Sequence, residues 1–217
     1  PVMNLRLAEP ASLVDLSRVP GLDGIEAKGG AITVGAMATH AAVADSGDVK
    51  KAIPGLADLA SHIGDPHVRN RGTIGGSIAN NDPAADYPAA LLALGATVKT
   101  TKREIAADDF FTGLFSTALE DGEIITGVSF PVPEKFAYAK LANRASRFAL
   151  VGVAVAKTKD GVRVAATGAG ADGVFRVKAA EVALSKKFDA SALDGVKVDT
   201  KGMSSDMHAD AEYRAHL

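Results

Sequence analysis

Residues 69–86 (RNRGTIGGSIANNDPAAD) combine a glycine pair with hydroxyl, amide and acidic side chains, which suits a loop that approaches a diphosphate closely. Gly75 and Gly76 lack a Cβ, so they can adopt positive φ and bring backbone N–H groups to an anion. Thr73 and Ser77 add hydroxyl donors. The pattern predicts a loop that binds paired phosphates through its main-chain amides.

The same stretch, called the signature segment below, continues with acceptors of the kind that ribose hydroxyls need. Pro83 and Pro88 stiffen the path between them. A nucleotide cofactor is the ligand that this combination favours. The alternative is that a Thr-Ile-Gly-Gly turn simply joins two buried segments, because glycine is foremost a turn residue. The predicted acceptors are Asn80, Asn81, Asp82 and Asp86.

Composition limits the classes of function. The 217 residues are enough for one large domain or two small ones. The formal net charge of -2 leaves no basic excess to neutralise a polynucleotide, so we expect no nucleic-acid partner. The chain has no cysteine, so any disulfide, iron–sulfur or thiolate chemistry must reside on a partner. The lack of cysteine fits a cytoplasmic protein.

No apolar run approaches the roughly 20 residues that span a bilayer, and the first residues lack a basic start followed by an apolar region. We therefore expect no transmembrane segment. The first residue is Pro1 and not methionine, which predicts that these residues begin inside a longer product, or that a first part was removed.

Short apolar stretches alternate with helix-start and turn signals in the first 130 residues. The run from Leu13 to Leu16 predicts a strand, and the alternating residues 31–36 predict another. Thr39 is a good N-cap for a helix that begins near His40. Proline, glycine and apolar spacing further predict a helix from Pro54 stopped by Gly64-Asp65-Pro66, a helix from Pro88 to Leu94 ended by Gly95, and strands at 97–101 and 123–130.

Pro131 and Pro133 predict a domain boundary, because neither can donate to a strand ladder and both break helices. The division is 1–132 and 133–217. Beyond the boundary, three consecutive strands predict an antiparallel meander, with a hairpin turn through Asp160-Gly161. The predicted strands are 136–142, 150–156 and 162–167, and the predicted helices are 175–184 and 209–215.

A dinucleotide-binding pattern, G-x-G-x-x-G, occurs at residues 168–173. The strand before it is better explained as the third member of the meander, and no second β-α-β half follows. We therefore interpret these glycines as a turn.

Metal and hydrolase sites lack their usual spacing. None of the five histidines shows the i, i+4 pairing with an acid that zinc enzymes use, and no Gly-x-Ser-x-Gly elbow or phosphate loop occurs. Asp108-Asp109 could be a catalytic acid pair, but a solvated turn before the aromatic pair Phe110-Phe111 is favoured, because adjacent side chains point apart. The histidines are His40, His62, His67, His208 and His216.

Nearly the whole chain resembles the FAD subunit of the molybdenum hydroxylases, the family of xanthine dehydrogenase and aerobic carbon monoxide dehydrogenase. The stretches that carry the resemblance are MNLRLAEPASLVDLSRVPGL, TVGAMATH, PGLADLASHIGDPHVRNRGTIGGSIANNDPAADYPAALLALGA, ADDFFTG and LANRASRFALVGVAVA. The resemblance implies an α+β fold: an FAD-binding domain of the PCMH type, followed by a C-terminal domain with a small antiparallel sheet and helices.

The resemblance also implies a set of cofactor-binding residues and no catalytic or metal residue in this chain. By similarity, Thr73, Ile74, Gly75, Gly76 and Ser77 bind the FAD diphosphate, and Asp86 holds the ribose region. Ile63 occupies the place where some relatives have an aromatic ring near the flavin, and an isoleucine cannot stack as phenylalanine does. Ile125 and Lys140 match positions that contact the adenine or isoalloxazine portions.

Lys140, Arg144 and Arg147 form a basic cluster with two interpretations. They are either a solvated strand edge or cations beside the flavin, where positive charge stabilises the anionic reduced ring.

The function implied by the resemblance is electron transfer. A large subunit with a molybdenum cofactor oxidises the substrate, a small subunit carries [2Fe-2S] clusters, and the FAD subunit passes the electrons to an external acceptor. A dimer of heterotrimers is the expected assembly. One alternative is a truncated structural subunit that holds no flavin. Another is a self-sufficient flavin oxidoreductase, against which the absence of an acid–base residue near the signature segment argues.

Relatives carry a further half-domain with a second glycine-rich loop upstream of Met3-Asn4-Leu5-Arg6. The resemblance therefore implies that this chain lacks the N-terminal half of the FAD-binding domain. We expect this polypeptide alone to bind FAD weakly, and tight stoichiometric binding in a flavin titration would refute that.

Overall fold

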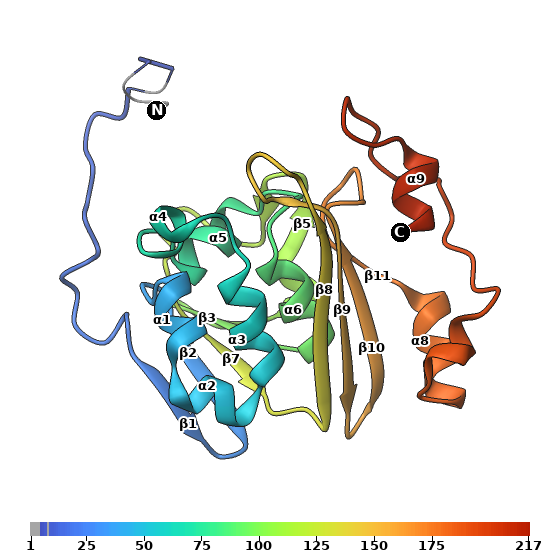
Figure 1. Ribbon diagram of the computed structural model, residues 1–217. Coiled ribbons are helices and arrows are strands. Elements are labelled where there is room, and N and C mark those ends of the chain that lie inside the picture. Colours follow the sequence, from blue (N-terminus) through green and yellow to red (C-terminus); the bar gives the residue numbers. More distant parts are fainter. Residues whose placement is uncertain (1–4, 8) are drawn as a thin grey trace.

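The computed structural model describes residues 5–7 and 9–217, which form two antiparallel sheets with helices between and outside them (Figure 1). The helices are α1 (His40–Asp45), α2 (Gly47–Ala52), α3 (Pro54–Ser61), α4 (Pro66–Arg69), α5 (Ile74–Asn80), α6 (Tyr87–Leu94), α7 (Ala107–Phe110), α8 (Lys178–Lys186), the 3₁₀ helix η1 (Ala190–Leu193) and α9 (Ala211–His216). The mixture of helix and sheet confirms the predicted α+β class.

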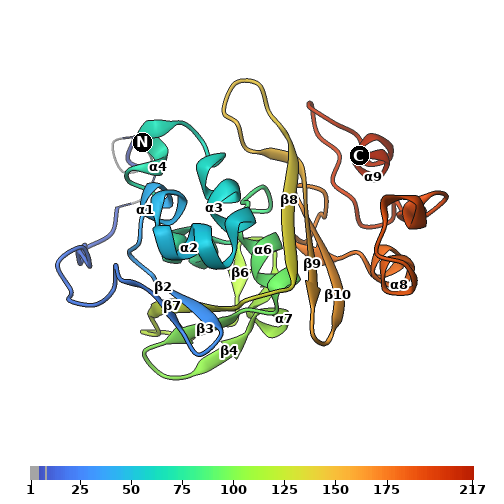
Figure 2. The same ribbon diagram turned by 60° about the horizontal axis from the view of Figure 1, so that its bottom comes forward.

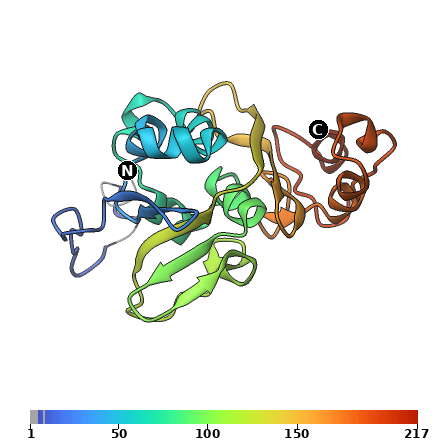
Figure 3. The same cartoon turned by 90° about the horizontal axis from the view of Figure 1, so that it is seen from below.

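The first sheet has five strands in the order β1-β2-β7-β3-β4. Its strands are β1 (Ile25–Lys28), β2 (Ala31–Gly35), β3 (Thr97–Thr100), β4 (Glu104–Ala106) and β7 (Ile125–Pro131). The central strand β7 places Val128 opposite both Val34 and Val98, so three apolar side chains meet on one face. Figure 3 shows α1 to α3 lying over this sheet.

The second sheet has four strands in the order β11-β10-β9-β8, all antiparallel. Its strands are β8 (Lys135–Ala142), β9 (Ala149–Thr158), β10 (Gly161–Thr167) and β11 (Phe175–Arg176). The predicted meander is confirmed. Gly168 and Gly173 have φ of 77° and 105° in the connection from β10 to β11, so the glycine-rich pattern there forms a turn and not a dinucleotide-binding unit. A two-stranded hairpin, β5 (Phe111–Gly113) and β6 (Ser116–Thr117), completes the sheet structure.

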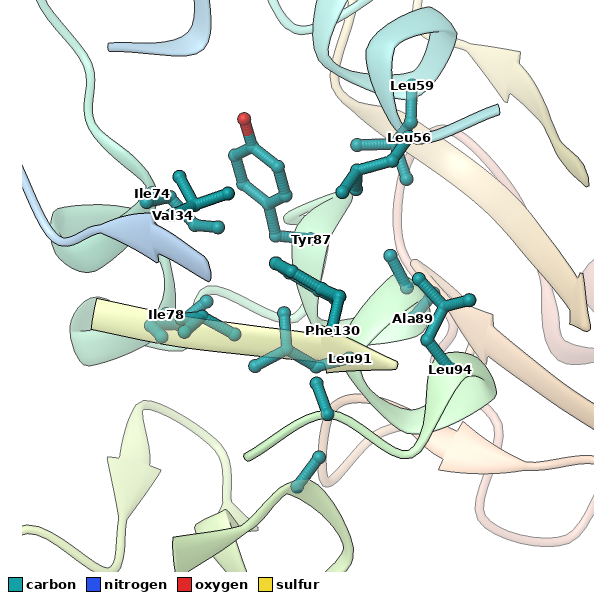
Figure 4. Close-up of a cluster of buried hydrophobic side chains, with 14 of the residues drawn as sticks. Val34, Leu56, Leu59, Ile74, Ile78, Tyr87, Ala89, Leu91, Leu94 and Phe130 are labelled. Atoms are coloured by element: carbon teal, nitrogen blue, oxygen red, sulfur yellow. The ribbon is translucent and has the colours of Figure 1, made fainter. Parts of the chain in front are cut away.

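Helix α6 lies at the centre of the molecule, and all eight of its residues are buried. It contacts β9 and β10 of the second sheet and β7 of the first, and Figure 4 shows its side chains beside Phe130 of β7. An isolated helix that is apolar all round would be insoluble, so both sheets are needed to cover it. Gly95 ends the helix with φ of 62°, as predicted.

The two sheets share one hydrophobic core. The largest buried cluster includes Val34 and Phe130 from the first sheet together with Ala154 and Ala165 from the second. The chain leaves the first sheet at Pro131 and enters the second at Lys135. The division into 1–132 and 133–217 stays a prediction.

Two predicted elements are wrong in detail, and one strand is not predicted. The run from Leu13 to Leu16 is no strand, and Leu13 and Val14 are exposed, because no neighbouring strand pairs with it among the described residues. The strand before β2 is instead β1, an edge strand with the charged residues Glu26 and Lys28. Phe175 and Arg176 pair with β10, so the following helix begins only at Lys178.

Over the described residues, none of the helices is long and apolar enough to cross a membrane. The same residues contain no group of three or more metal-ligating side chains.

A candidate cofactor site in two adjoining hollows

Residues 73–77 of the signature segment form the N-cap and first turn of helix α5 and not a loop. Thr73 is the N-cap, and its Oγ1 accepts a hydrogen bond from the N–H of Gly76 at 3.1 Å. Neither Gly75 nor Gly76 has a positive φ. The prediction that these two glycines turn with positive φ is therefore wrong, because both lie in the first turn of the helix.

Gly75 is required by packing. A Cβ on this residue would lie 2.6 Å from the carbonyl oxygen of Ala36 and 2.7 Å from its Cβ, so only glycine lets α5 approach the chain that follows β2. The N–H of Gly75 donates to that same carbonyl at 2.9 Å, and the N–H of Ile74 donates to the carbonyl of Ala38 at 3.1 Å. These contacts fix the N-terminus of α5 against the first sheet.

These bonds correct the prediction that the amides around the glycine pair are free to bind an anion. The amides of Ile74, Gly75 and Ser77 all donate to carbonyl oxygens, and that of Gly76 donates to its N-cap hydroxyl. What remains for a ligand is side-chain chemistry: the O–H hydrogens of Thr73 and Ser77 can still be donated. Gly76 is exposed, so its surface is open to a ligand.

The first hollow has a volume of about 450 Å³ and is lined in part by the N-cap and exposed face of α5. Six of its nine lining residues have polar or charged side chains. Thr73, Ser77 and Asn80 supply hydroxyl and amide groups, and the guanidinium of Arg71 supplies positive charge. The lining residues are His40, Arg71, Gly72, Thr73, Gly76, Ser77, Asn80, Asp82 and Ala85. Such a wall is suited to an anionic group.

His40 closes the back of the first hollow and is only 5% exposed. Burial, together with the positive charge of Arg69, lowers the pKa of His40 to about 4, so the imidazole is neutral at physiological pH. Its Nδ1 has no hydrogen-bond partner among the described residues, and neither has the hydroxyl of Tyr87, whose ring centroid is 5.4 Å away. A Cβ at Gly72 would lie 2.5 Å from its Nε2.

The second hollow has a volume of about 490 Å³ and shares Ser77, Asp82 and Ala85 with the first, so the two hollows adjoin and are together called the groove below. Apolar side chains dominate its far wall. The lining residues are Ile63, Gly64, Val68, Ser77, Asp82, Ala84, Ala85, Asp86, Ser146 and Phe148. Ser146 and Phe148 lie between the end of β8 and the start of β9, and this loop is drawn at the top of Figure 2. This wall suits a flat apolar ring.

Asp86 and Lys140, predicted separately to bind cofactor, lie together in the structure. The Nζ of Lys140 is 2.8 Å from Oδ1 of Asp86, and both side chains are less than a tenth exposed. Burial raises the pKa of Asp86, while Lys140 and then the Tyr138 hydroxyl act to lower it. Lys140 also donates to the carbonyl of Arg147 at 3.1 Å.

Other predicted residues lie elsewhere. Ile125 is buried in β7, 5% exposed, and lines neither hollow. Asn81 is buried, and its amide nitrogen donates to the carbonyls of Gly113 and Ser116. These two bonds stabilise the β5–β6 hairpin, so the side chain does not face a ligand. Of the basic cluster, Lys140 is buried, whereas Arg144 and Arg147 are exposed.

Asp108 has a structural role. Its carboxylate accepts from Arg163 of β10 at 2.6 and 2.7 Å and from Arg176 of β11 at 3.2 Å. Although burial acts to raise it, the pKa of Asp108 is lowered by these two guanidinium groups. These bonds from the two arginines to Asp108 therefore tie α7 to the second sheet. The catalytic alternative for Asp108-Asp109 gains no support. Phe110 is fully buried, as an aromatic anchor should be.

The fold and the groove define an α+β protein with a binding surface that offers hydroxyl, amide and guanidinium groups in one hollow and mainly apolar side chains in the next. Residues 1–133 match the family described as the FAD binding domain in molybdopterin dehydrogenase. The chain therefore belongs to this family, which confirms the predicted resemblance, the predicted fold type and FAD as the cofactor. It is a component of an oxidoreductase.

Similar proteins cover the entire chain. It is 38% identical to the nicotine 6-hydroxylase medium subunit of Paenarthrobacter nicotinovorans and 33% identical to the carbon monoxide dehydrogenase medium chain of Hydrogenophaga pseudoflava, over 100% of this chain and 81% of each relative. The solved carbon monoxide dehydrogenase from Hydrogenophaga pseudoflava, which lacks the Mo-pyranopterin moiety, matches with a TM-score of 0.88 at 34% identity, over 100% of this chain and 80% of that one.

Proposed function

We propose that the chain holds FAD along the groove, accepts electrons from iron–sulfur clusters of a partner and passes them to an external acceptor. The observation that carries this is that the two hollows adjoin at Ser77, Asp82 and Ala85. The hydroxyl donors and Arg71 of the first hollow suit a diphosphate, and the more apolar second hollow suits the isoalloxazine ring. When bound, FAD supplies a group that accepts electrons singly and releases them in pairs.

The proposed roles of the residues follow from the geometry. Thr73 and Ser77 donate their hydroxyls to phosphate oxygens, and exposed Gly76 allows the close approach. Ile74 and Gly75 act indirectly, by docking α5 against the first sheet. Asp86 accepts from a ligand hydroxyl, and Ile63 contacts the ring from the far wall. For Ile125 the geometry supports packing instead of cofactor contact.

The proposed partners are a large subunit with the molybdenum cofactor and a small subunit with [2Fe-2S] clusters, in a dimer of heterotrimers. Two observations support a multi-subunit enzyme. Two of the relatives named above are a medium subunit and a medium chain, and this chain has no cysteine to ligate a cluster. The cytoplasm is the proposed location. The domains are proposed as 1–132 for FAD binding and 133–217 for the C-terminal part.

The test is the FAD affinity of the complex of this chain with its partner subunits. We expect flavin absorption bands in the purified complex, and a Ser77→Ala variant should bind FAD about tenfold more weakly, because it loses one hydrogen bond to a charged group. The matched control is Ser185→Ala, an exposed serine on α8 far from the groove. A complex that contains no flavin would instead support the alternative of a structural subunit without cofactor.

A further inference from the structure

The wall shared by the two hollows is held in place by the second sheet. The hydroxyl of Thr167, on β10, donates to the carbonyls of Pro83 at 3.0 Å and Ala85 at 2.6 Å, and the N–H of Gly168 donates to Pro83 at 2.8 Å. The segment from Asp82 to Asp86 therefore takes its shape from strands that come more than 60 residues later.

Tyr138 is the side chain that extends this support to the carboxylate of Asp86. Its hydroxyl donates to Oδ1 of Asp86 at 2.6 Å. Tyr138 and Lys140 are two residues apart on β8, so both project from the same face of the strand toward α6. Both contacts end on Oδ1, and Asp86 lines the second hollow, so its second oxygen, Oδ2, is the one that a ligand can engage without displacing Tyr138 or Lys140.

Gly152 makes room for this contact. A Cβ at position 152 would lie 2.1 Å from the Tyr138 hydroxyl and 2.8 Å from the ring carbon that carries it. The phenol of Tyr138 thus packs against Gly152 of β9, in the space that a side chain at position 152 would fill. Neither Tyr138 nor Gly152 lines either hollow.

We propose that Tyr138 is a positioning residue for cofactor binding: it orients the Asp86 carboxylate so that Oδ2 faces the groove and accepts from a hydroxyl of the bound polyol chain. This inference rests on the proposed function. Tyr138 contacts no ligand itself and acts through Asp86 alone. The same chemistry would serve a ribityl or a ribose hydroxyl, because both offer an O–H donor to a carboxylate oxygen.

The experiment measures the FAD affinity of the apo-complex, reconstituted with FAD, for wild type and Tyr138→Phe. We expect about tenfold weaker binding in Tyr138→Phe, since one charge-assisted hydrogen bond no longer fixes the carboxylate. In an Asp86→Ala background the same change should have no further effect, because the group through which Tyr138 acts is missing. Gly152→Ala, which keeps the hydroxyl but displaces it, should show a comparable loss.

The pH dependence of FAD binding separates positioning from general stability. The groups that face the carboxylate are Lys140 and Tyr138 from β8 and the neighbouring Tyr87 on α6. Without the Tyr138 bond the pKa of Asp86 rises further, so FAD affinity should fall off in acid at a higher pH than in wild type. A merely structural loss would leave that pH unchanged. Tyr213→Phe, at an exposed tyrosine of α9, is the matched control.

The outcomes distinguish the two proposals. A wild-type complex that fails to bind FAD overturns the proposed function and this inference with it. A wild-type complex that binds FAD, with Tyr138→Phe showing the same affinity and the same pH profile, overturns this inference alone. An equal loss in the Asp86→Ala background also overturns it, because Tyr138 would then act by another route.

Discussion

Gly75→Ala is expected to lower the free energy of unfolding by about 2–3 kcal/mol, while Gly76→Ala changes it by less than about 1 kcal/mol. The two glycines are adjacent, yet their surroundings differ. A Cβ at Gly75 meets the backbone of Ala36 at 2.6 Å, whereas a Cβ at Gly76 meets only the Thr73 hydroxyl at 3.1 Å. Moving the Ala36 backbone away from a new Cβ costs much free energy, whereas a small shift of the Thr73 hydroxyl costs little.

FAD binding should respond differently from stability to these two substitutions. Gly76→Ala keeps the fold and places a methyl group on the exposed surface of the first hollow, so it should weaken FAD binding in a stable protein. Urea unfolding and FAD titration of both variants provide the measurement. If Gly75→Ala were as stable as wild type, the close packing of α5 on Ala36 would be wrong.

Lys140→Met is expected to lower stability by about 3 kcal/mol at neutral pH, because it leaves the buried Asp86 carboxylate without its cation. The remaining Tyr138 hydrogen bond compensates only in part, since the lost partner lies 2.8 Å away in a site less than a tenth exposed. Methionine fills a similar volume, so the loss reports on charge more than on packing.

The pH dependence of this loss has a definite sign. The pKa of folded Asp86 is raised by burial, so its contribution to stability is complete below the unfolded pKa of about 4 and is lost as pH rises through the folded pKa. Removing Lys140 raises the folded pKa further. The stability deficit of Lys140→Met should therefore be small in acid and should grow as pH rises toward neutrality.

Asp86→Asn in the Lys140→Met background is the matched control. It removes the unpaired charge and keeps the shape, so most of the lost stability should return and the pH dependence should disappear. Urea unfolding between about pH 4 and pH 8 measures both effects. A deficit that is constant over this range would mean that Asp86 and Lys140 are not coupled.

Local patterns predicted the secondary structure best where one signal dominated. Helix α6 was found from its proline start and glycine end, and strands β8 to β10 from apolar runs separated by turn residues. Strand β1 was missed because it is a charged edge strand, and the run from Leu13 to Leu16 misled because apolar character alone supplies no pairing strand.

The cofactor-binding residues stay a prediction, but the structure shows which of them lie together. Thr73 and Ser77 line the same hollow. The glycine pair was misread as a free loop, because whether an amide is free depends on Ala36 and Ala38, which lie in a different segment. Tyr138 was missed because it meets Asp86 only in the folded chain, 52 residues away in sequence.

We propose that FAD lies along the groove, with its diphosphate at Thr73 and Ser77 and a hydroxyl of its polyol chain at Asp86. The decisive experiment is a crystal structure of the complex with FAD bound. We expect phosphate oxygens within hydrogen-bonding distance of both hydroxyls, with the amides of Ile74 and Gly75 still bonded to Ala38 and Ala36. Cofactor density elsewhere, or a diphosphate held by those two amides, would contradict it.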